Sequence, residues 1–281
     1  MEEIKSLLST LAKEKNNIQS ILASLRSLEK VMEFPENNLH KIKIEVEKVT
    51  KKLTTSSLID PLKEEIASTI QNYQEQIPDW EIKAKKMFFE ELENVLAEAG
   101  FTLRGDSSRL MVSVFTLELD LDNLKVIIWY GNKQENVVSC RLNPAAVVTK
   151  LAAAQKKIME REFDSETFLA QLFSAYKAAS ERQIGKDKTR VPISDVLKEF
   201  VYLIQPKKFY LNPSKNNFLG YERTFFSFDM FRLPERVIEG YELNLITATR
   251  AYTKNRTNFL WIPTDLLGNG DYISHITFKE I

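Results

Sequence analysis

Apolar residues recur at alternating steps of four and three along residues 4–32, with Lys15 and Glu29 as the polar interruptions. This spacing places one apolar stripe on a helix and is typical of coiled coils. After FPENN (34–38) the spacing restarts, so the two stripes predict an antiparallel helical hairpin over residues 1–53. The residues expected to bind a partner, within the hairpin or on another chain, are Ile4, Leu8, Leu11, Ile18, Leu22, Leu25, Leu39, Ile42, Val46 and Val49.

Two prolines are expected to begin further helices after the hairpin. Asp60 and Pro61 form a favourable N-cap and first helical position, and Pro78 is expected to begin a fourth helix. Gly100 stands where a helix commonly ends. We therefore predict a helical arm over residues 1–99, in which two helices follow the hairpin.

The apolar period changes from 3.6 to 2 at residue 101. Residues 109–142 predict three strands of an antiparallel meander. Asn143 is expected to cap the helix over 144–159, and a second helix is expected to follow Asp164 and to end near 185. The second predicted region is therefore 100–185, a β-meander plus two helices.

The third predicted region, 186–281, opens with the linker KDKTR (186–190) and a short helix over 191–205. In the stretch YERTFFSFDMFRL (221–233), aromatic residues alternate onto both sides, which favours a strand buried on both faces. The fold class predicted for the whole chain is α+β: a coiled-coil arm, then a mixed body of antiparallel sheets with intervening helices. The strands predicted in this third region lie near 208–211, 223–232, 241–249, 257–263 and 272–278.

Composition restricts the classes of partner. The 39 basic and 39 acidic residues balance, so no global field attracts nucleic acid or a membrane. Cys140 is the single cysteine, which excludes an internal disulfide and a multi-cysteine zinc site. Residues 1–15 lack the basic start of a signal peptide, and no apolar run approaches the ~18 residues of a membrane span. We expect a cytoplasmic protein that does not enter a membrane.

Candidate chemistry is sparse. The sequence contains neither a Walker A motif nor G-x-G-x-x-G, and its two histidines, His40 and His275, are far apart in the sequence. Glu118, Asp120 and Asp122 fall on one side of a predicted strand, where carboxylates could hold Mg²⁺ for a nuclease. The acid-x-Lys pair of such nucleases is missing. We expect no catalytic residue, no metal and no cofactor.

Basic charge is concentrated in one part of the chain. Residues 141–220 hold fourteen Lys and Arg residues against eight acidic ones, and aromatic residues such as Phe209, Tyr210 and Phe218 stand among them. Basic loops beside exposed aromatic rings suit phosphate contact with base stacking. The candidate residues for binding nucleic acid are Lys186, Lys188, Arg190, Lys207, Lys208, Lys215, Arg250, Lys254 and Arg256.

These patterns favour a non-catalytic interaction or scaffold subunit that docks through its coiled-coil arm into a larger intracellular complex. The basic segment is compatible with a DNA-handling or defence-type complex. The expected partners are other protein subunits or a second copy of the chain. One alternative is a module that binds DNA or RNA through residues 186–215 and the turn at 250–256. The second alternative is a metal-dependent nuclease that uses Glu118, Asp120 and Asp122.

Overall fold

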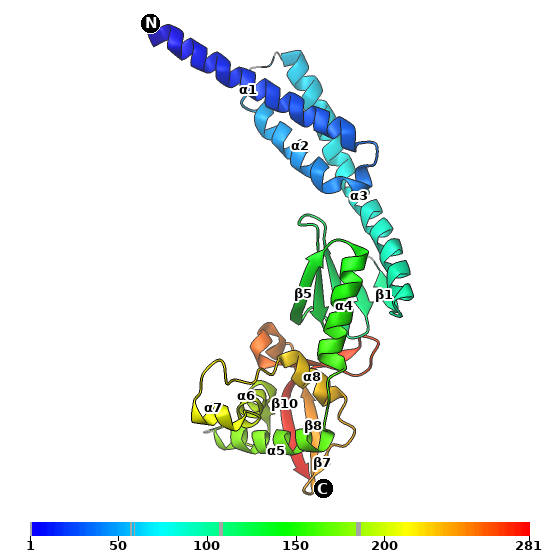
Figure 1. Ribbon diagram of the computed structural model, residues 1–281, viewed down its shortest axis with the longest axis vertical. Coiled ribbons are helices and arrows are strands. Elements are labelled where there is room, and N and C mark those ends of the chain that lie inside the picture. Colours follow the sequence, from blue (N-terminus) through cyan, green and yellow to red (C-terminus); the bar gives the residue numbers. More distant parts are fainter. Residues whose placement is uncertain (1, 57, 59, 107–108, 184–186) are drawn as a thin grey trace. The chain divides into compact units, whose positions relative to one another are not determined.

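The computed structural model describes residues 2–56, 58, 60–106, 109–183 and 187–281. The chain has an α+β fold and divides into two compact units (Figure 1). One unit contains Met1–Val95 and Asp120–Lys125, and the other contains Leu96–Leu119 and Val126–Ile281. The α+β class predicted from the sequence is confirmed. The division into three regions stays a prediction.

The arm unit consists of three α-helices and one short 3-10 turn. Helices α1 (Glu2–Val31) and α2 (Leu39–Leu53) pack side by side and are joined through η1 (Pro35–Asn37). Helix α3 (Asp60–Glu98) then packs against this hairpin. The core of the arm consists of Ile21, Leu28, Val31, Leu39, Ile42, Val46, Val49, Leu53, Ile70 and Trp80.

The helix break predicted at Pro78 is wrong, because α3 runs through it without interruption. Proline lacks an N–H and crowds the preceding turn, so it normally ends or kinks a helix. Here apolar side chains on both sides of the proline contact the arm core: Tyr73 and Ile77 precede it, and Trp80 follows it. This packing keeps the chain helical where the local propensity does not.

The first sheet of the second unit has the strand order β1-β2-β3-β4-β5. Its strands are β1 (Leu103–Asp106), β2 (Arg109–Val112), β3 (Phe115–Asp120), β4 (Lys125–Tyr130) and β5 (Glu135–Arg141). The first strand predicted for the meander is divided in two at Ser113, whose φ is 52°, and β2 pairs antiparallel with β3. Helix α4 (Pro144–Met159) packs along β5, and Asn143 caps it by accepting from the Ala146 N–H at 3.0 Å.

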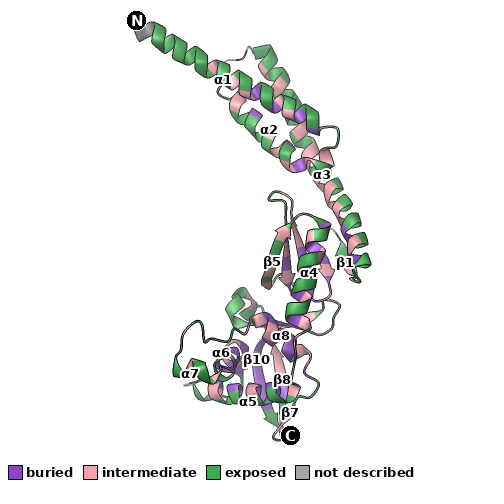
Figure 2. Ribbon diagram, in the orientation of Figure 1, coloured by how far each residue is buried: buried purple, intermediate pink, exposed green. Residues whose placement is uncertain are grey.

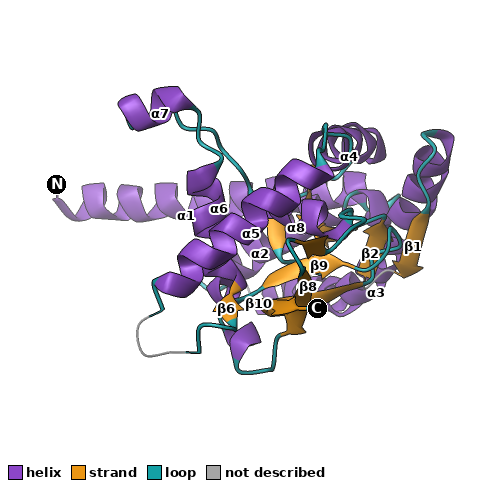
Figure 3. Cartoon of the chain, turned by 90° about the horizontal axis from the view of Figure 1, so that it is seen from below, coloured by secondary structure: helices purple, strands orange, loops and turns teal. Residues whose placement is uncertain are grey.

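The second sheet has the order β6-β10-β8-β7, with β9 paired to β10. Its strands are β6 (Val191–Pro192), β7 (Val237–Ile238), β8 (Tyr241–Thr247), β9 (Leu260–Pro263) and β10 (Gly270–Glu280). Helices α5 (Ser165–Glu181) and α6 (Ile193–Leu203) pack beside β10 (Figure 3). The rings of Phe173 and Tyr176 on α5 lie 4.8 and 5.0 Å from the ring of Phe278.

Two predicted strands are helices, and these predictions are wrong. Residues 208–211 lie in α7 (Lys207–Leu211), and residues 223–232 form α8 (Arg223–Phe231) with its C-cap. Aromatic residues favour strands, which misled the prediction. Phe226 and Met230 are four residues apart, so as a helix the segment puts both into the core cluster, which Leu233 joins just beyond the helix end.

Two short 3-10 turns, η2 (Tyr252–Lys254) and η3 (Arg256–Asn258), lie between β8 and β9. The second of them, η3, occupies the first part of the strand predicted at 257–263, which therefore begins later, at Leu260. Prediction and structure agree on strands within 241–249 and 272–278.

Trp261 lies against two glycines in the second unit. A Cβ atom at Gly131 would come within 2.6 Å of the indole ring, and one at Gly270 within 2.5 Å. Gly131 also has a φ of 67°, a conformation that residues with a side chain rarely adopt. The ring of Tyr130 meets the indole edge-on at 5.3 Å, so this contact joins the end of β4 to β9.

A buried carboxylate holds α8 in place. Asp229 is 2% exposed and accepts from Arg161 Nη2 with both oxygens, at 2.8 and 2.9 Å. Arg232 Nε donates to the same carboxylate at 2.9 Å, and the Tyr221 hydroxyl donates to it as well. Burial, together with the charge of Asp229, raises the pKa of the Tyr221 phenol far above its usual value. Both oxygens of the Asp229 carboxylate therefore accept hydrogen bonds from side chains of the protein.

Replacing Asp229 with alanine is expected to destabilise the second unit. The substitution leaves two partly buried guanidinium groups without a counter-charge, which typically costs about 3–5 kcal/mol. The matched control is Asp195→Ala, because the pair of Asp195 with Lys198 is largely exposed and should contribute no more than about 0.5 kcal/mol. Urea unfolding followed by circular dichroism at pH 8 measures both. A loss below about 1 kcal/mol for Asp229→Ala would show that the network is dispensable.

Candidate functional site

Helix α1 is twice as long as the helix it packs against. It has 30 residues and α2 has 15, so at about 1.5 Å per residue α1 is about 45 Å long and α2 about 22 Å. The N-terminal half of α1 therefore lies beyond α2 in the arm (Figure 1). In this half, residues 4–13, 15 and 16 are exposed and Glu14 is half-buried (Figure 2).

This exposed half is rich in large apolar side chains. Ile4, Leu7, Leu8 and Leu11 are 61–65% exposed, and beyond this half Ile18 and Leu22 are 42% and 45% exposed. A monomeric soluble protein rarely leaves so many neighbouring apolar side chains in water unless they serve an interaction. The α1 stripe is defined as Ile4, Leu7, Leu8, Leu11, Ile18 and Leu22.

The α1 stripe and the buried face of α1 are different faces of one helix. The side chains of α1 that face the arm core are Ile21, Ser24, Leu28 and Val31, each at most 6% exposed. At about 100° of rotation per residue, their mean direction lies about 130° from that of the stripe. Packing against α2 therefore leaves the stripe uncovered. Leu25 lies between the two faces and is half-buried.

The structure separates the residues predicted to bind a partner into two groups. Those on α2, namely Leu39, Ile42, Val46 and Val49, are at most 6% exposed and belong to the core of the arm itself. Those on α1 before Leu25 are exposed. Leu7 was not among the predicted residues, although its position between Ile4 and Leu11 on the same face was a usable signal.

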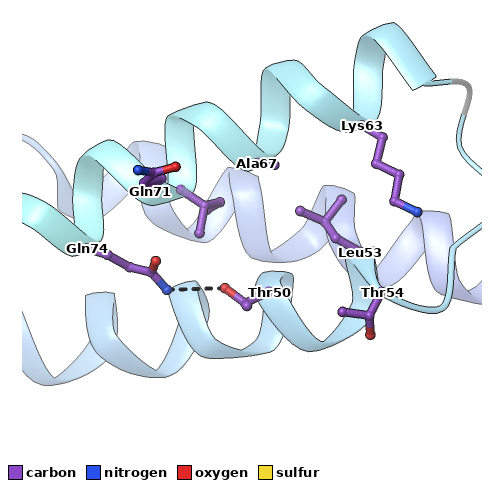
Figure 4. A pocket seen from close by; sticks show the side chains of 8 residues that line it. Thr50, Leu53, Thr54, Lys63, Ala67, Gln71 and Gln74 are labelled. Atoms are coloured by element: carbon purple, nitrogen blue, oxygen red, sulfur yellow. Dashed lines mark hydrogen bonds between the residues drawn. The ribbon is translucent and has the colours of Figure 1, made fainter.

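A cleft of about 350 Å³ lies between α2 and α3, with Leu53 beside it (Figure 4). Gln74 Nε2 donates to Thr50 Oγ1 across it at 3.4 Å. Lys63 is the charged side chain in its lining, so the cleft offers no set of titratable groups for catalysis. Its lining consists of Thr50, Leu53, Thr54, Lys63, Ala67, Ile70, Gln71 and Gln74.

Two carboxylates of the proposed metal site have partners of their own. Glu118 accepts from Trp129 Nε1 at 2.8 Å and from Lys133 Nζ at 2.6 Å. Asp120 accepts from the side-chain and backbone N–H groups of Asn123 at 2.8 and 3.0 Å, and these bonds hold the pKa of Asp120 below its usual value. Asp120 thus closes the turn after β3.

Asp122 belongs to the arm unit and is also paired. Its carboxylate lies 2.6 Å from Lys43 Nζ, which contacts Glu81 as well. Burial alone would lower the pKa of Lys43, but the hydrogen bonds to both acids outweigh burial and raise it. Within the described residues, no group of three or more His, Cys, Asp or Glu side chains is arranged to hold a metal ion. The metal-dependent nuclease therefore gains no support.

The basic residues predicted to bind nucleic acid occupy several loops of the second unit. Lys186 lies outside the described residues. The charge of Arg190 lowers the pKa of His275. The ring of His275 meets that of Tyr252 edge-on at 5.0 Å, so Arg190 and the turn at 250–256 both lie near this histidine. Lys188, Arg250 and Lys254 are exposed in loops, and Arg256 pairs with Glu135.

The loop that carries α7 combines lysines with exposed rings. Lys207, Lys208 and Lys215 are all exposed, and residues 200–221 contain no acid. Tyr210 and Phe218 are each 47% exposed. This loop therefore has the composition expected of a surface that contacts phosphate and bases.

The remaining titratable candidates are ordinary structural residues. Burial raises the pKa of the Cys140 thiol in β5, which lowers its reactivity at neutral pH. His40 lies half-buried on α2. None of the helices in the described parts of the chain is long and apolar enough to cross a bilayer.

Comparison with protein-family models, with curated proteins and with solved structures gave no match to this chain.

Stability near neutral pH should depend on His275. Burial, and then the charge of Arg190, lower the pKa of His275 in the folded protein below its usual value. The unfolded chain therefore binds this proton more readily, and the free energy of unfolding falls as the pH drops through about 6.5. Urea titrations at pH 7.5 and 5.5 should show a smaller fall for His275→Gln than for the wild type. Equal falls would contradict the assignment.

Proposed function

We propose that this protein is a non-catalytic interaction subunit that docks into a larger assembly through the α1 stripe. The observation that supports the proposal is the exposure of six large apolar side chains on one face of α1, away from the arm core. Amphipathic helices bind partners through such faces, either in a groove or in a coiled coil.

The size of the stripe fits this role. At about 200 Å² for each large side chain when fully exposed, the six residues leave on the order of 600 Å² of apolar surface in water. That is at the upper end of the largest apolar patches on typical monomers, which measure about 300–600 Å² and are often functional. The arm supports the stripe rigidly, because the C-terminal half of the same helix is anchored by Ile21, Leu28 and Val31.

Acidic substitutions in the stripe should abolish docking. Leu8→Glu with Leu11→Glu places two charges where apolar contact is expected, and the lost burial alone amounts to about 3 kcal/mol or more. In size-exclusion chromatography of lysate from the native cells, the wild type should elute at an apparent mass larger than the 32.5 kDa of one chain. The double variant should elute at the volume of the free chain.

The matched control is Ser9→Glu with Asn16→Glu, which adds the same charge to exposed positions of α1 about 130–155° from the stripe. It should elute like the wild type. Circular dichroism should show unchanged helix content in both variants. Elution of the stripe variant with the wild type would remove the proposal.

A second candidate function is the binding of single-stranded nucleic acid by the loop that carries α7. The exposure of Tyr210 and Phe218 beside Lys207, Lys208 and Lys215, in a segment without acids, favours it. Phosphate contacts and base stacking together support such binding, and the phosphate contacts make it sensitive to salt.

Replacing Lys207, Lys208 and Lys215 with glutamine should weaken this binding. Each lost phosphate contact lowers the slope of log K against log salt by about 0.7 for single strands, so the slope should fall by about 2. Fluorescence anisotropy of a labelled 20-nucleotide single strand between 50 and 200 mM salt measures it. The control replaces the exposed arm residues Lys30, Lys41 and Lys86 in the same way. Equal binding by both triple variants would exclude the loop.

A further inference from the structure

We propose that the α1 stripe pairs with the α1 stripe of a second copy of this chain, with the two helices antiparallel. The inference rests on the proposed function, in which the stripe is a docking surface, and it names the partner. Three properties of the stripe carry it: the symmetry of its spacing, the position of Lys15 and its area.

The spacing of the stripe is nearly the same in both directions. Its seam positions are 4, 8, 11, 15, 18 and 22, and reversal about residue 13 maps 4 onto 22, 8 onto 18 and 11 onto 15. In an antiparallel pair, Ile4 therefore meets Leu22 of the other copy, and Leu8 meets Ile18. Every apolar position except 11 faces an apolar position, as a coiled-coil seam requires. Leu7 flanks this seam and extends its apolar surface.

Lys15 distinguishes the two orientations. It is exposed in the middle of the stripe, at a seam position. In a parallel pair in register, it would face the Lys15 of the other copy, which sets two like charges against each other. In the antiparallel pair it faces Leu11, where its aliphatic stem can pack while the ammonium group reaches water. A single polar residue at a seam position commonly fixes register and orientation in this way.

The area agrees with a dimer. Two stripes that cover each other would bury on the order of 1,200 Å² in total, the lower end of the ~1,200–2,000 Å² of stable interfaces. The pairing segment, residues 4–22, is about 28 Å long and lies mostly beyond α2. The arm core, with Leu28 and Val31, can therefore stay intact when the pair forms. We expect association at about 10–100 µM or tighter.

Engineered disulfides test the pairing and its orientation in the full chain. One variant carries Ile4→Cys and a second, larger by a purification tag, carries Leu22→Cys, both with Cys140→Ser. Oxidised glutathione supplies the oxidant: two protein thiols become one disulfide, and the glutathione disulfide is reduced to two thiols. In the mixture at 100 µM, we expect the mixed disulfide to exceed either homodimer at least five-fold on non-reducing gels. Ser9→Cys, exposed away from the stripe, gives the background from random collision.

The other results overturn the inference. Homodimers of Ile4→Cys in excess would establish a parallel pair and contradict the antiparallel one. Cross-links no greater than for Ser9→Cys, together with a wild-type mass of 32.5 kDa by light scattering at 100 µM, would exclude self-pairing. If Leu8→Glu with Leu11→Glu still abolished the larger assembly in lysate, the docking function would stand and its partner would be a different protein. If neither experiment responded, both proposals would fail.

Discussion

The difference in length between α1 and α2 is the constraint on which the arm depends. A helix buries a face only where another element lies beside it, and α2 accompanies α1 for half its length. The buried contacts of Ile21, Leu28 and Val31 in the arm core fix the rotation of α1 about its own axis. That rotation directs the α1 stripe into water along its full length. This includes Ile18 and Leu22, although they are close in sequence to the buried Ile21. One internal contact therefore determines which external surface the arm offers.

The second unit is organised around polar groups that are satisfied from within. The Asp229 carboxylate accepts hydrogen bonds from Arg161, Arg232 and Tyr221, and these contacts stabilise the position of α8. Both of its oxygens are therefore already occupied by partners within the protein. The same holds for Glu118, which is paired with Trp129 and Lys133. Catalytic groups usually stand ready to exchange partners. Here the ionic contacts of Asp229 and Glu118 connect elements of the fold.

The sequence predicted those elements whose signals are local. Asn143 caps α4 as expected, and the helix expected after Asp164 begins there, because a side chain that accepts from the N–H three residues later needs no distant partner. Longer-range effects were missed. Pro78 stays within a helix because Trp80, which follows it, packs into the arm core. Phe226 lies in a helix because that conformation lets its side chain pack into the core cluster of the second unit. The α1 stripe was found from its spacing, but which face of α1 is buried depends on how α2 packs, and spacing alone does not contain that.

The contact of Trp261 with Gly131 and Gly270 joins the end of β4 to the paired strands β9 and β10. A methyl group at either glycine would overlap the indole. A smaller residue at 261 would not make alanine acceptable at either position, because Gly131 has a φ of 67° and a Cβ atom at Gly270 would also lie 2.6 Å from the backbone oxygen of Ile262. In related sequences, both glycines should therefore stay fixed even where the residue at 261 varies.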